Sequence, residues 1–136
     1  KNLPVDVAIF SAAVSDFKVV KKHKEKIKKQ DELTIKLEKN IDILNYVSTH
    51  NSMRPKLVVG FAAETNNLEE NAISKLKNKN CDIIIANDVS NKDIGFDSDI
   101  NEVTIYYNNN KKEKLSTQSK SSISEEIVNR LINYIN

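Results

Sequence analysis

The stretch LVVGFAAETNNLEENAISKLKNKNCDIIIA, residues 57–86, determines the fold of this 136-residue chain. It contains two apolar runs, Leu57–Ala63 and Ile83–Ala86, in which the hydrophobic residues are continuous and do not alternate with polar ones. Continuous apolar runs of this length are typical of strands that are buried on both faces of a parallel sheet. The two runs therefore predict neighbouring parallel strands.

The segment between the two runs predicts a helix. Leu68, Ala72 and Leu76 recur at helical spacing, and Asn66 or Asn67 precedes them in a position to cap the first turn. Glutamates follow the cap and lysines fill the last turn, and both placements suit the helix dipole. Together the three elements form a β–α–β unit, which should cross over right-handed.

The flanking sequence adds further strands and a helix. A third continuous run, Val7–Val14, predicts another buried strand. Glu32–Lys39 and Asn101–Tyr107 alternate between apolar and polar residues, which predicts two half-exposed strands. Asn40 is expected to cap a helix that has Asp42 in its first turn.

The end of the chain predicts a closing helix. Ser122–Glu125 has the sequence of a capping box. The residues expected to face the core follow it at helical intervals: Ile127, Val128, Leu131, Ile132 and Ile135. The expected fold class is α/β: a single domain, residues 1–136, with a Rossmann-like, mainly parallel sheet flanked by helices and an additional antiparallel strand arm.

Composition restricts the classes of protein that this chain can represent. Its formal net charge is only +2, so the molecule as a whole does not have the charge of a polyanion binder. The single cysteine, Cys81, fits a reducing compartment and is expected to be a small buried hydrophobe. No run approaches the roughly 18 apolar residues of a membrane span. No signal peptide is visible either, so a cytoplasmic location is expected.

Residue spacing disfavours two kinds of site. The two glycines, Gly60 and Gly95, form neither a G-x-G-x-x-G pattern nor a P-loop, which excludes a nucleotide site built on a glycine-rich turn. His23, His50 and Cys81 have no partners at metal-ligand spacing, so a zinc site is not expected.

The carboxyl ends of the parallel strands are the expected place for a ligand. Ala12 and Ala13 would let a ligand approach the backbone after the first run, and Asp16 would place a carboxylate at the rim. The alternative, with about even weight, is that the alanines pack under helices and Asp16 caps a turn. Asn87 and Asp88 likewise either line a pocket or form a turn.

Lysines are concentrated in one segment of the chain. Residues 18–29, KVVKKHKEKIKK, contain seven lysines and one glutamate. This run is either a solvated loop or a mobile clamp for a ligand with several negative charges. Lys75 and Lys79 lie four residues apart on one face of the predicted helix. Lysines from these two sources, with the strand-end loops, could together hold a triphosphate.

Several segments, taken in order, resemble the phosphopantothenate–cysteine ligase (phosphopantothenoylcysteine synthetase) family of bacterial coenzyme A synthesis. They are AAVSDF, EKIKK, LTIKLEKNIDIL, the stretch from VVGFAAET to IIIANDVS, and GFDSDINEVTIYY. The resemblance implies that the chain is the C-terminal portion of a ligase domain. Enzymes of this family use CTP and magnesium to convert the carboxylate of 4'-phosphopantothenate into an acyl-cytidylate, from which the amine of cysteine displaces CMP.

The resemblance also implies individual site residues. The family's K-x-K-K motif falls on Lys26–Lys29, which makes Lys26 the catalytic lysine of a flap that closes over the nucleotide and the intermediate. The implied nucleotide contacts are Asp16, Lys26, Phe61, Lys75, Lys79, and the Ile41, Asp42, Ile43 and Leu44 of the family's Asn-Pro-Asp-Ile segment. Ile41 stands where the family has proline, which restores a backbone N–H at the helix start. Metal ligands are not implied.

The resemblance implies partners as well. The chain is expected to lack the first part of the family's domain, with its glycine-rich turn and an asparagine that handles the acyl-cytidylate, so we expect no ligase activity from it alone. Strands Leu33–Leu37 and Val103–Tyr107 are expected to build the arm of a homodimer. Bacterial relatives are often fused to a flavin-dependent decarboxylase. Neither nucleic acid nor a membrane is an expected partner.

Two other classes of protein are alternatives. A non-enzymatic module could bind RNA or another polyanion through residues 18–29, although Phe17 is the only aromatic residue close to that run. A dinucleotide-binding oxidoreductase domain is disfavoured by the absence of the glycine motif.

Overall fold

The computed structural model describes residues 3–21, 25–28, 32–90 and 98–136. Its centre is the predicted β–α–β unit, made of strand β4 (Leu57–Glu64), helix α2 (Leu68–Asn78) and strand β5 (Ile83–Asp88). β4 and β5 pair in parallel along their length. The prediction from the central stretch of sequence is therefore confirmed.

β4 and β5 lie inside a five-stranded sheet with the order β1-β4-β5-β6-β7. The outer strands are β1 (Val7–Phe10), β6 (Ile100–Tyr107) and β7 (Lys112–Ser119). β1, β4 and β5 are parallel, whereas β6 and β7 run antiparallel. β1 ends at Phe10 rather than at Val14, the end of the apolar run. The expected α/β class with a mainly parallel sheet is confirmed.

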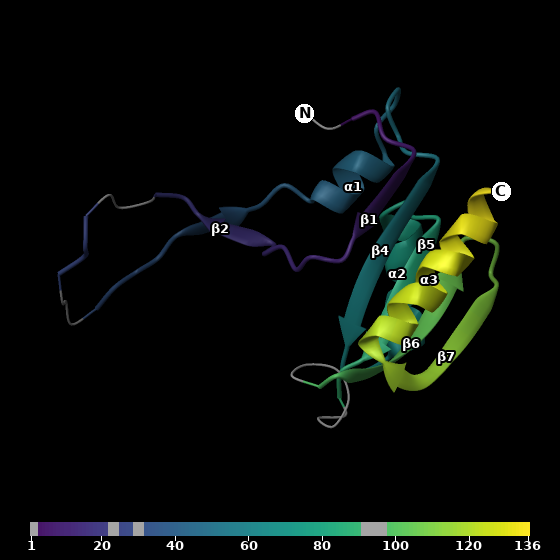
Figure 1. The fold of residues 1–136 in the computed structure, drawn as a ribbon. Helices are drawn as coiled ribbons and strands as arrows, with labels where there is room; N and C mark the ends of the chain where they lie inside the picture. Colours follow the sequence, from purple (N-terminus) through teal and green to yellow (C-terminus); the bar gives the residue numbers. More distant parts are fainter. Residues whose placement is uncertain (1–2, 22–24, 29–31, 91–97) are drawn as a thin grey trace.

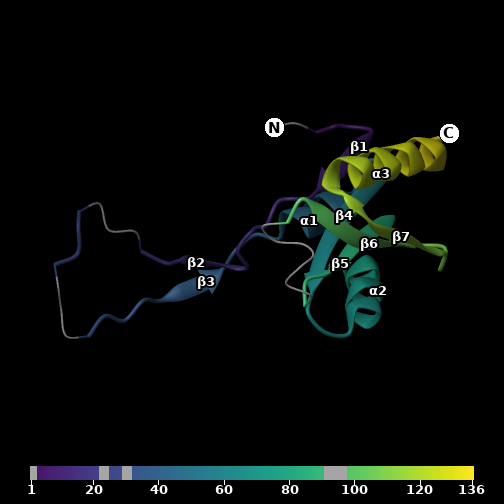
Figure 2. The same ribbon diagram turned by 60° about the horizontal axis from the view of Figure 1, so that its bottom comes forward.

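Helices cover both faces of this sheet (Figures 1 and 2). α3 (Lys120–Ile135) lies on one face, where Ile123, Ile127 and Leu131 pack against alternate residues of the central strands. α1 (Ile43–Ser48) and α2 lie on the other face. The isoleucines of β5 are fully buried by the two layers, which explains why this strand is continuously apolar. In the described part of the chain, no helix is long and apolar enough to cross a bilayer.

Two predicted helix starts need correction. α3 begins earlier than the predicted capping box, because its N-cap is Ser119, whose Oγ accepts a hydrogen bond from the Ser122 amide at 3.1 Å. α2 follows Asn67 as predicted, but Asn67 has a φ of 50° and makes no capping hydrogen bond with its side chain. Asparagine tolerates this left-handed conformation better than most residues.

The core face of α3 is narrower than predicted. Ile127 and Leu131 are buried as expected, together with Ile123. The residues wrongly assigned to the core are 44–50% exposed: Val128, Ile132 and Ile135. Residues four apart share one face of a helix, and the sheet covers only the stripe that contains the three buried residues.

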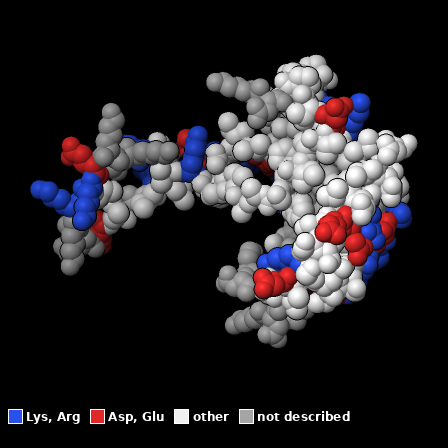
Figure 3. All heavy atoms as spheres, viewed as in Figure 1, with Lys and Arg blue, Asp and Glu red and all other residues white. Residues whose placement is uncertain are grey.

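An antiparallel pair of strands outside the main sheet forms the expected arm. β2 (Phe17–Val19) pairs with β3 (Leu37–Lys39), and the pair projects from the domain (Figures 1 and 2). The prediction of a strand over Glu32–Lys39 is wrong except at its last three residues. Figure 3 shows that charged side chains at the outer end of the arm are separate from those on the domain.

The second strand expected in the arm belongs to the main sheet instead. Val103–Tyr107 is part of β6, where Val103 and Ile105 are buried on the α3 side and Tyr106 on the α2 side. The prediction that this segment builds the arm is wrong, because both of its faces are covered by helices.

Arg130 ties α3 to the hairpin of β6 and β7. Its Nε donates to the Glu113 carboxylate at 2.8 Å, and the Tyr107 hydroxyl donates to the same carboxylate at 3.1 Å. Lys111 pairs with Glu113 at 2.8 Å. Hydrogen bonds from Lys111 and Arg130 lower the pKa of Glu113 to about 2, against the opposing effect of burial. The ionised form of Glu113 therefore stabilises the folded chain.

The substitution Glu113→Gln should destabilise the fold in a pH-dependent way. The pKa of this carboxyl falls from 4.5 to about 2 on folding. Its contribution to the free energy of unfolding is therefore complete above pH 4.5, and it is lost as the pH falls through the folded pKa. We expect the free energy of unfolding to decrease by about 1 kcal/mol at neutral pH. The decrease should shrink toward zero in strong acid. Urea denaturation of both proteins across this range measures it, and a difference that is independent of pH would contradict this account.

Candidate functional site

A group of polar atoms meets where α1 and α2 lie beside β4. Asp42 precedes α1, Lys75 and Lys79 belong to α2 or its end, and Phe61 contributes its backbone carbonyl from β4. We call these four residues the α1–α2 cluster. All four were predicted site residues, and the structure brings them together.

Asp42 starts α1. Its Oδ1 accepts a hydrogen bond from the Asn45 amide at 2.9 Å, so Asp42 is the N-cap and the prediction of Asn40 as the cap is wrong. Asn40 instead fixes the base of the arm. Its side-chain Nδ2 donates to the Ser15 carbonyl at 3.1 Å, and its backbone N–H donates to the Asp16 carbonyl at 2.7 Å.

The other carboxylate oxygen of Asp42 forms an ion pair with the Nζ of Lys79. Both side chains are about one-third exposed, at 35% for Asp42 and 34% for Lys79, so solvent reaches the pair. Burial raises the pKa of Asp42, but the Asn45 amide, Lys79 and Lys75 together lower it further, and the net shift is downward. Asp42 is therefore ionised at neutral pH and holds the Lys79 ammonium in place.

Lys75 is held by the backbone of β4. Its Nζ donates to the Phe61 carbonyl at 2.7 Å. β1 ends at Phe10, opposite Gly60, so this carbonyl lies just beyond the last residue of β4 that pairs with β1. An ammonium group has three N–H donors. Lys75 therefore keeps donors for an anion while it binds the carbonyl.

α1 approaches β4 closely at Gly60. A Cβ at this position would lie 2.8 Å from Ile84 Cδ1 and 3.2 Å from Leu44 Cδ2. The Leu44 side chain therefore packs onto the sheet beside the cluster. The other two hydrophobic residues predicted at the helix start point outward, because Ile41 is 68% exposed and Ile43 is 48% exposed.

A buried polar hub, formed by Arg54 and Asp82, fixes the position of α1 relative to α2. The Arg54 Nε donates to the Ser48 carbonyl at the end of α1 at 2.9 Å. Its Nη2 donates to the Asn80 carbonyl after α2 at 3.0 Å and to the Asp82 carboxylate at 3.1 Å. Asp82 is 9% exposed and also accepts a hydrogen bond from the Val58 amide at 2.7 Å.

Ser48 completes the connection from the hub to the cluster. It is fully buried, and its hydroxyl donates to the Lys79 carbonyl. Its own carbonyl accepts a hydrogen bond from Asn80 Nδ2 at 2.9 Å. Arg54 and Asp82 were not among the predicted site residues. The available signal was an aspartate directly before a buried strand, where unpaired backbone groups require polar partners.

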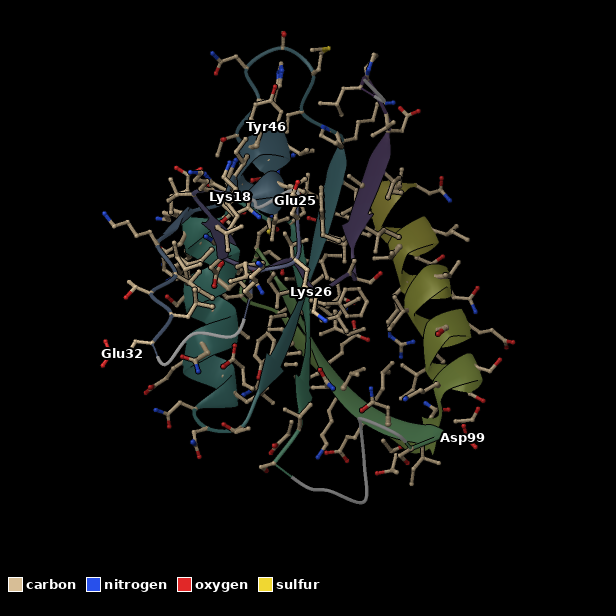
Figure 4. All side chains as sticks on the ribbon, turned by 90° about the vertical axis from the view of Figure 1, so that its left-hand side faces the viewer. Lys18, Glu25, Lys26, Glu32, Tyr46 and Asp99 are labelled. Carbon is tan, nitrogen blue, oxygen red and sulfur yellow. The ribbon has the colours of Figure 1, made fainter. Side chains whose placement is uncertain are left out.

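The structure does not bring two other predicted site residues, Asp16 and Lys26, to the cluster. Asp16 lies at the base of the arm beside Asn40. Residues 25–28, which include Lys26, lie at the outer end of the arm, away from the sheet and helices (Figures 1 and 2). Figure 4, in which the arm points toward the viewer, shows Lys26 and Glu25 in front of the domain. Lys29, the end of the K-x-K-K motif, lies outside the described residues, as do residues 22–24 and Gly95.

Four other residues have a clear outcome. Ala12 and Ala13 are exposed, so the alternative in which they pack under helices is wrong. Asp88 Oδ1 accepts hydrogen bonds from the amide and the hydroxyl of Ser90, at 2.9 and 2.6 Å, so Asp88 forms a turn. Cys81 is buried, and its burial raises the pKa of its thiol to about 11, which confirms its interpretation as a small buried hydrophobe.

Residues 1–135 match a protein family described as the DNA/pantothenate metabolism flavoprotein C-terminal domain. The chain belongs to this family. As a member, it is 43% identical over 127 residues to the coenzyme A biosynthesis bifunctional protein CoaBC of Haemophilus influenzae, and 42% identical over 131 residues to that of Escherichia coli K12. These alignments cover 93% of this chain and 31% and 32% of the relatives, so the chain spans about a third of their length.

Solved structures agree with the family assignment. The crystal structure of the C-terminal domain of a coenzyme A biosynthesis bifunctional protein CoaBC matches with a TM-score of 0.73 and 32% identity. The match covers 96% of this chain and 55% of the chain in the crystal structure. A DNA/pantothenate metabolism flavoprotein from Streptococcus pneumoniae matches with a TM-score of 0.67 at 23% identity and supports the fold alone. The family resemblance found in the sequence is confirmed.

Two variants of Asp42 separate its capping role from its charge. Asp42→Asn keeps an oxygen for the Asn45 amide but lacks the charge that pairs with Lys79, whereas Asp42→Ala lacks both. We expect Asp42→Ala to lower the free energy of unfolding by about 1 kcal/mol, and Asp42→Asn by roughly half of that or less. Urea denaturation at neutral pH measures both. Equal losses would show that Asp42 is not the N-cap.

Proposed function

We propose that this chain is part of a phosphopantothenate–cysteine ligase, which uses CTP to activate the carboxylate of 4'-phosphopantothenate and then joins it to cysteine. Family membership and the CoaBC relatives, whose names place them in coenzyme A biosynthesis, support the proposal. The structural observation that supports it best is the α1–α2 cluster, with two ammonium groups at a partly exposed helix start. Because the chain spans about a third of its relatives, the complete activity is proposed for the whole protein.

The proposed reaction needs charge neutralisation more than proton transfer. In the first step a carboxylate oxygen of 4'-phosphopantothenate attacks the α-phosphorus of CTP, pyrophosphate leaves, and the acyl-cytidylate forms. The carboxylate is already ionised and needs no general base, so positioning and electrostatic stabilisation supply the catalysis. In the second step the cysteine amine attacks the acyl carbon, CMP leaves, and the amine loses a proton.

Lys75 and Lys79 are the residues that we propose for binding the triphosphate. The Phe61 carbonyl and the Asp42 carboxylate already hold their Nζ atoms, so little side-chain conformational freedom is lost when a nucleotide binds. Lysine is a compact point charge that suits the oxygens of a phosphate chain. The residues next to Asp42 (Ile41, Ile43 and Leu44) and Phe61 are proposed as further nucleotide contacts.

The proposed roles of Lys26 and Asp16 rest on the sequence resemblance. Residues 25–28 lie at the outer end of the arm (Figure 2). Lys26 therefore reaches a nucleotide at the α1–α2 cluster only if the arm moves or if the arm of a second chain supplies it.

A magnesium site held by the protein does not fit the described residues. They contain no group of three or more His, Cys, Asp or Glu side chains that could hold a metal ion. Asp42, the carboxylate of the cluster, already accepts hydrogen bonds from Asn45 and Lys79. We propose that magnesium enters with CTP as part of the substrate, bound mainly by phosphate oxygens.

We also propose that the arm joins two copies of this chain. Phe17, Leu33, Ile35 and Leu37 are each more than half exposed along it, with values of 57%, 54%, 60% and 57%. Exposed apolar surface gathered on a projecting segment is typical of a protein–protein contact. The bifunctional relatives support a second domain in the whole protein, and we propose from the family resemblance that it is a flavin-dependent decarboxylase.

Nucleotide binding tests the proposed function. We expect CTP with magnesium, at ten times its Kd, to raise the Tm by about 3 °C or more, and ATP or NAD to raise it less. Lys75→Gln and Lys79→Gln should each weaken CTP binding by about fivefold or more. Lys120→Gln, which changes an exposed lysine at the start of α3, is the matched control and should bind CTP normally. Thermal-shift titrations measure all of these.

Two outcomes of the same titrations would favour the alternatives. Stabilisation by any RNA, with a steep loss of affinity as salt rises, would indicate a polyanion-binding module. Stabilisation by NAD and not by CTP would indicate a dinucleotide-binding domain.

Ile35→Asp tests the proposed dimer. A buried carboxylate in an apolar contact is costly, so this variant should sediment as a monomer while the parent chain sediments as a dimer. Ile132→Asp on α3 is the control, because Ile132 is also an exposed isoleucine, at 50%, but lies outside the arm. An unchanged sedimentation coefficient for Ile35→Asp would count against the arm as the contact.

A further inference from the structure

A cleft of about 230 Å³ lies on the side of α2 that faces away from the α1–α2 cluster, between α2 and the β6–β7 hairpin. Ile73 and Leu76 of α2 and Tyr106 of β6 line it with apolar surface. Since successive helix residues are 100° apart, Ile73 and Lys77 lie on another side of α2 from Lys75. The cleft is therefore separate from the site proposed for the nucleotide.

Two polar contacts join the hairpin to α2 and to the residues that follow it, one at each end of the cleft. At one end, Lys112 Nζ reaches the Glu69 carboxylate of α2 at 2.8 Å. Lys112 is the partner of Tyr106 across the β6–β7 ladder, so this ion pair crosses directly over the apolar surface. At the other end, Asn108 Nδ2 donates to Asp82 Oδ1 at 3.2 Å. The space between these two contacts is also bounded by the turn that joins β6 to β7, through Asn108, Asn110 and Lys111.

Lys77 supplies positive charge at the opening, and the other two rim lysines pair with neighbouring carboxylates, Lys111 with Glu113 and Lys112 with Glu69. Lys77, Lys111 and Lys112 line the cleft, against the carboxylates of Glu69 and Asp82. Asp82 is already bound by a guanidinium group and a backbone amide, so its charge is largely satisfied inside the hub. Lys77 is exposed on the surface of α2. An anion at the rim would therefore be attracted, while an attached apolar group could reach the surface below.

We infer that this cleft binds a compact amphipathic anion, with one carboxylate or phosphate group attached to a single aromatic ring or an apolar body of similar size. Apolar walls with a few placed polar groups are the usual composition of small-molecule sites. The apolar body would contact Ile73, Leu76 and Tyr106, and the acid would lie among the rim lysines, nearest to Lys77. This site does not depend on the proposed ligase function.

Phenyl phosphate tests the inference on the full 136-residue chain. In a titration followed by ¹H–¹⁵N NMR, we expect saturable shifts of the amides around the cleft, including those of Ile73, Leu76, Tyr106 and Asn108. The Kd should be about 1 mM, a value typical of a ligand of this size. Inorganic phosphate and benzyl alcohol, which each carry half of the chemistry, should bind at least about fivefold more weakly. Benzoate replaces the phosphate by a carboxylate, and binding of either acid supports the inference.

Matched lysine variants test the role of the rim. Lys77→Gln should weaken phenyl phosphate binding about threefold to fivefold, and Lys56→Gln, which changes an exposed lysine away from the cleft, should not. Lys111→Gln provides a second rim variant if Lys77→Gln alters the spectrum of the free protein. The inference is overturned if the shifts are confined to Phe61, Lys75 and Lys79, if they do not saturate, or if the rim variants bind as well as the parent chain.

Discussion

The arrangement of this domain depends on the buried carboxylate of Asp82. A buried charge is costly unless its oxygens are satisfied, and here they accept hydrogen bonds from Arg54, the Val58 amide and a third residue, Asn108. These bonds connect the beginnings of β4 and β5 with the β6–β7 hairpin. Through the guanidinium group, which also binds carbonyls at the ends of α1 and α2, the same carboxylate sets the spacing between the two helices and thus the geometry of the α1–α2 cluster.

Local sequence patterns were sufficient for the centre of the fold and insufficient at its edges. The β–α–β unit over residues 57–86 was predictable because continuous apolar runs and a helical repeat report burial directly. The alternation over Glu32–Lys39 also suits a strand, but a strand needs a partner, and β2 offers only three paired residues. Likewise, Asp42 and Asn40 are both suitable caps. The chain uses the first because the second is occupied at the base of the arm.

The candidate site was predictable in part because helical periodicity determines which side chains share one face. The four-residue spacing of Lys75 and Lys79 places both on one helix face, whatever the rest of the fold does. The family resemblance added Asp42, and the structure places it against Lys79. Arg54 and Asp82 left no periodic signal, because they meet across 28 positions of the chain and through backbone groups. The outer end of the arm, with Lys26, remains apart from the cluster, so sequence order alone did not establish that these lysines converge.

α2 thus presents a charged side to α1 and a second side to the β6–β7 hairpin, and the hub holds both sides in place. The central functional claim is that the charged side binds CTP. The most direct measurement is an NMR titration of the ¹⁵N-labelled chain with CTP and magnesium. We expect saturable shifts that concentrate on residues 41–44, Phe61, Lys75 and Lys79. Shifts confined to residues 18–28 of the arm, or no saturable shifts at the cluster, would contradict the claim.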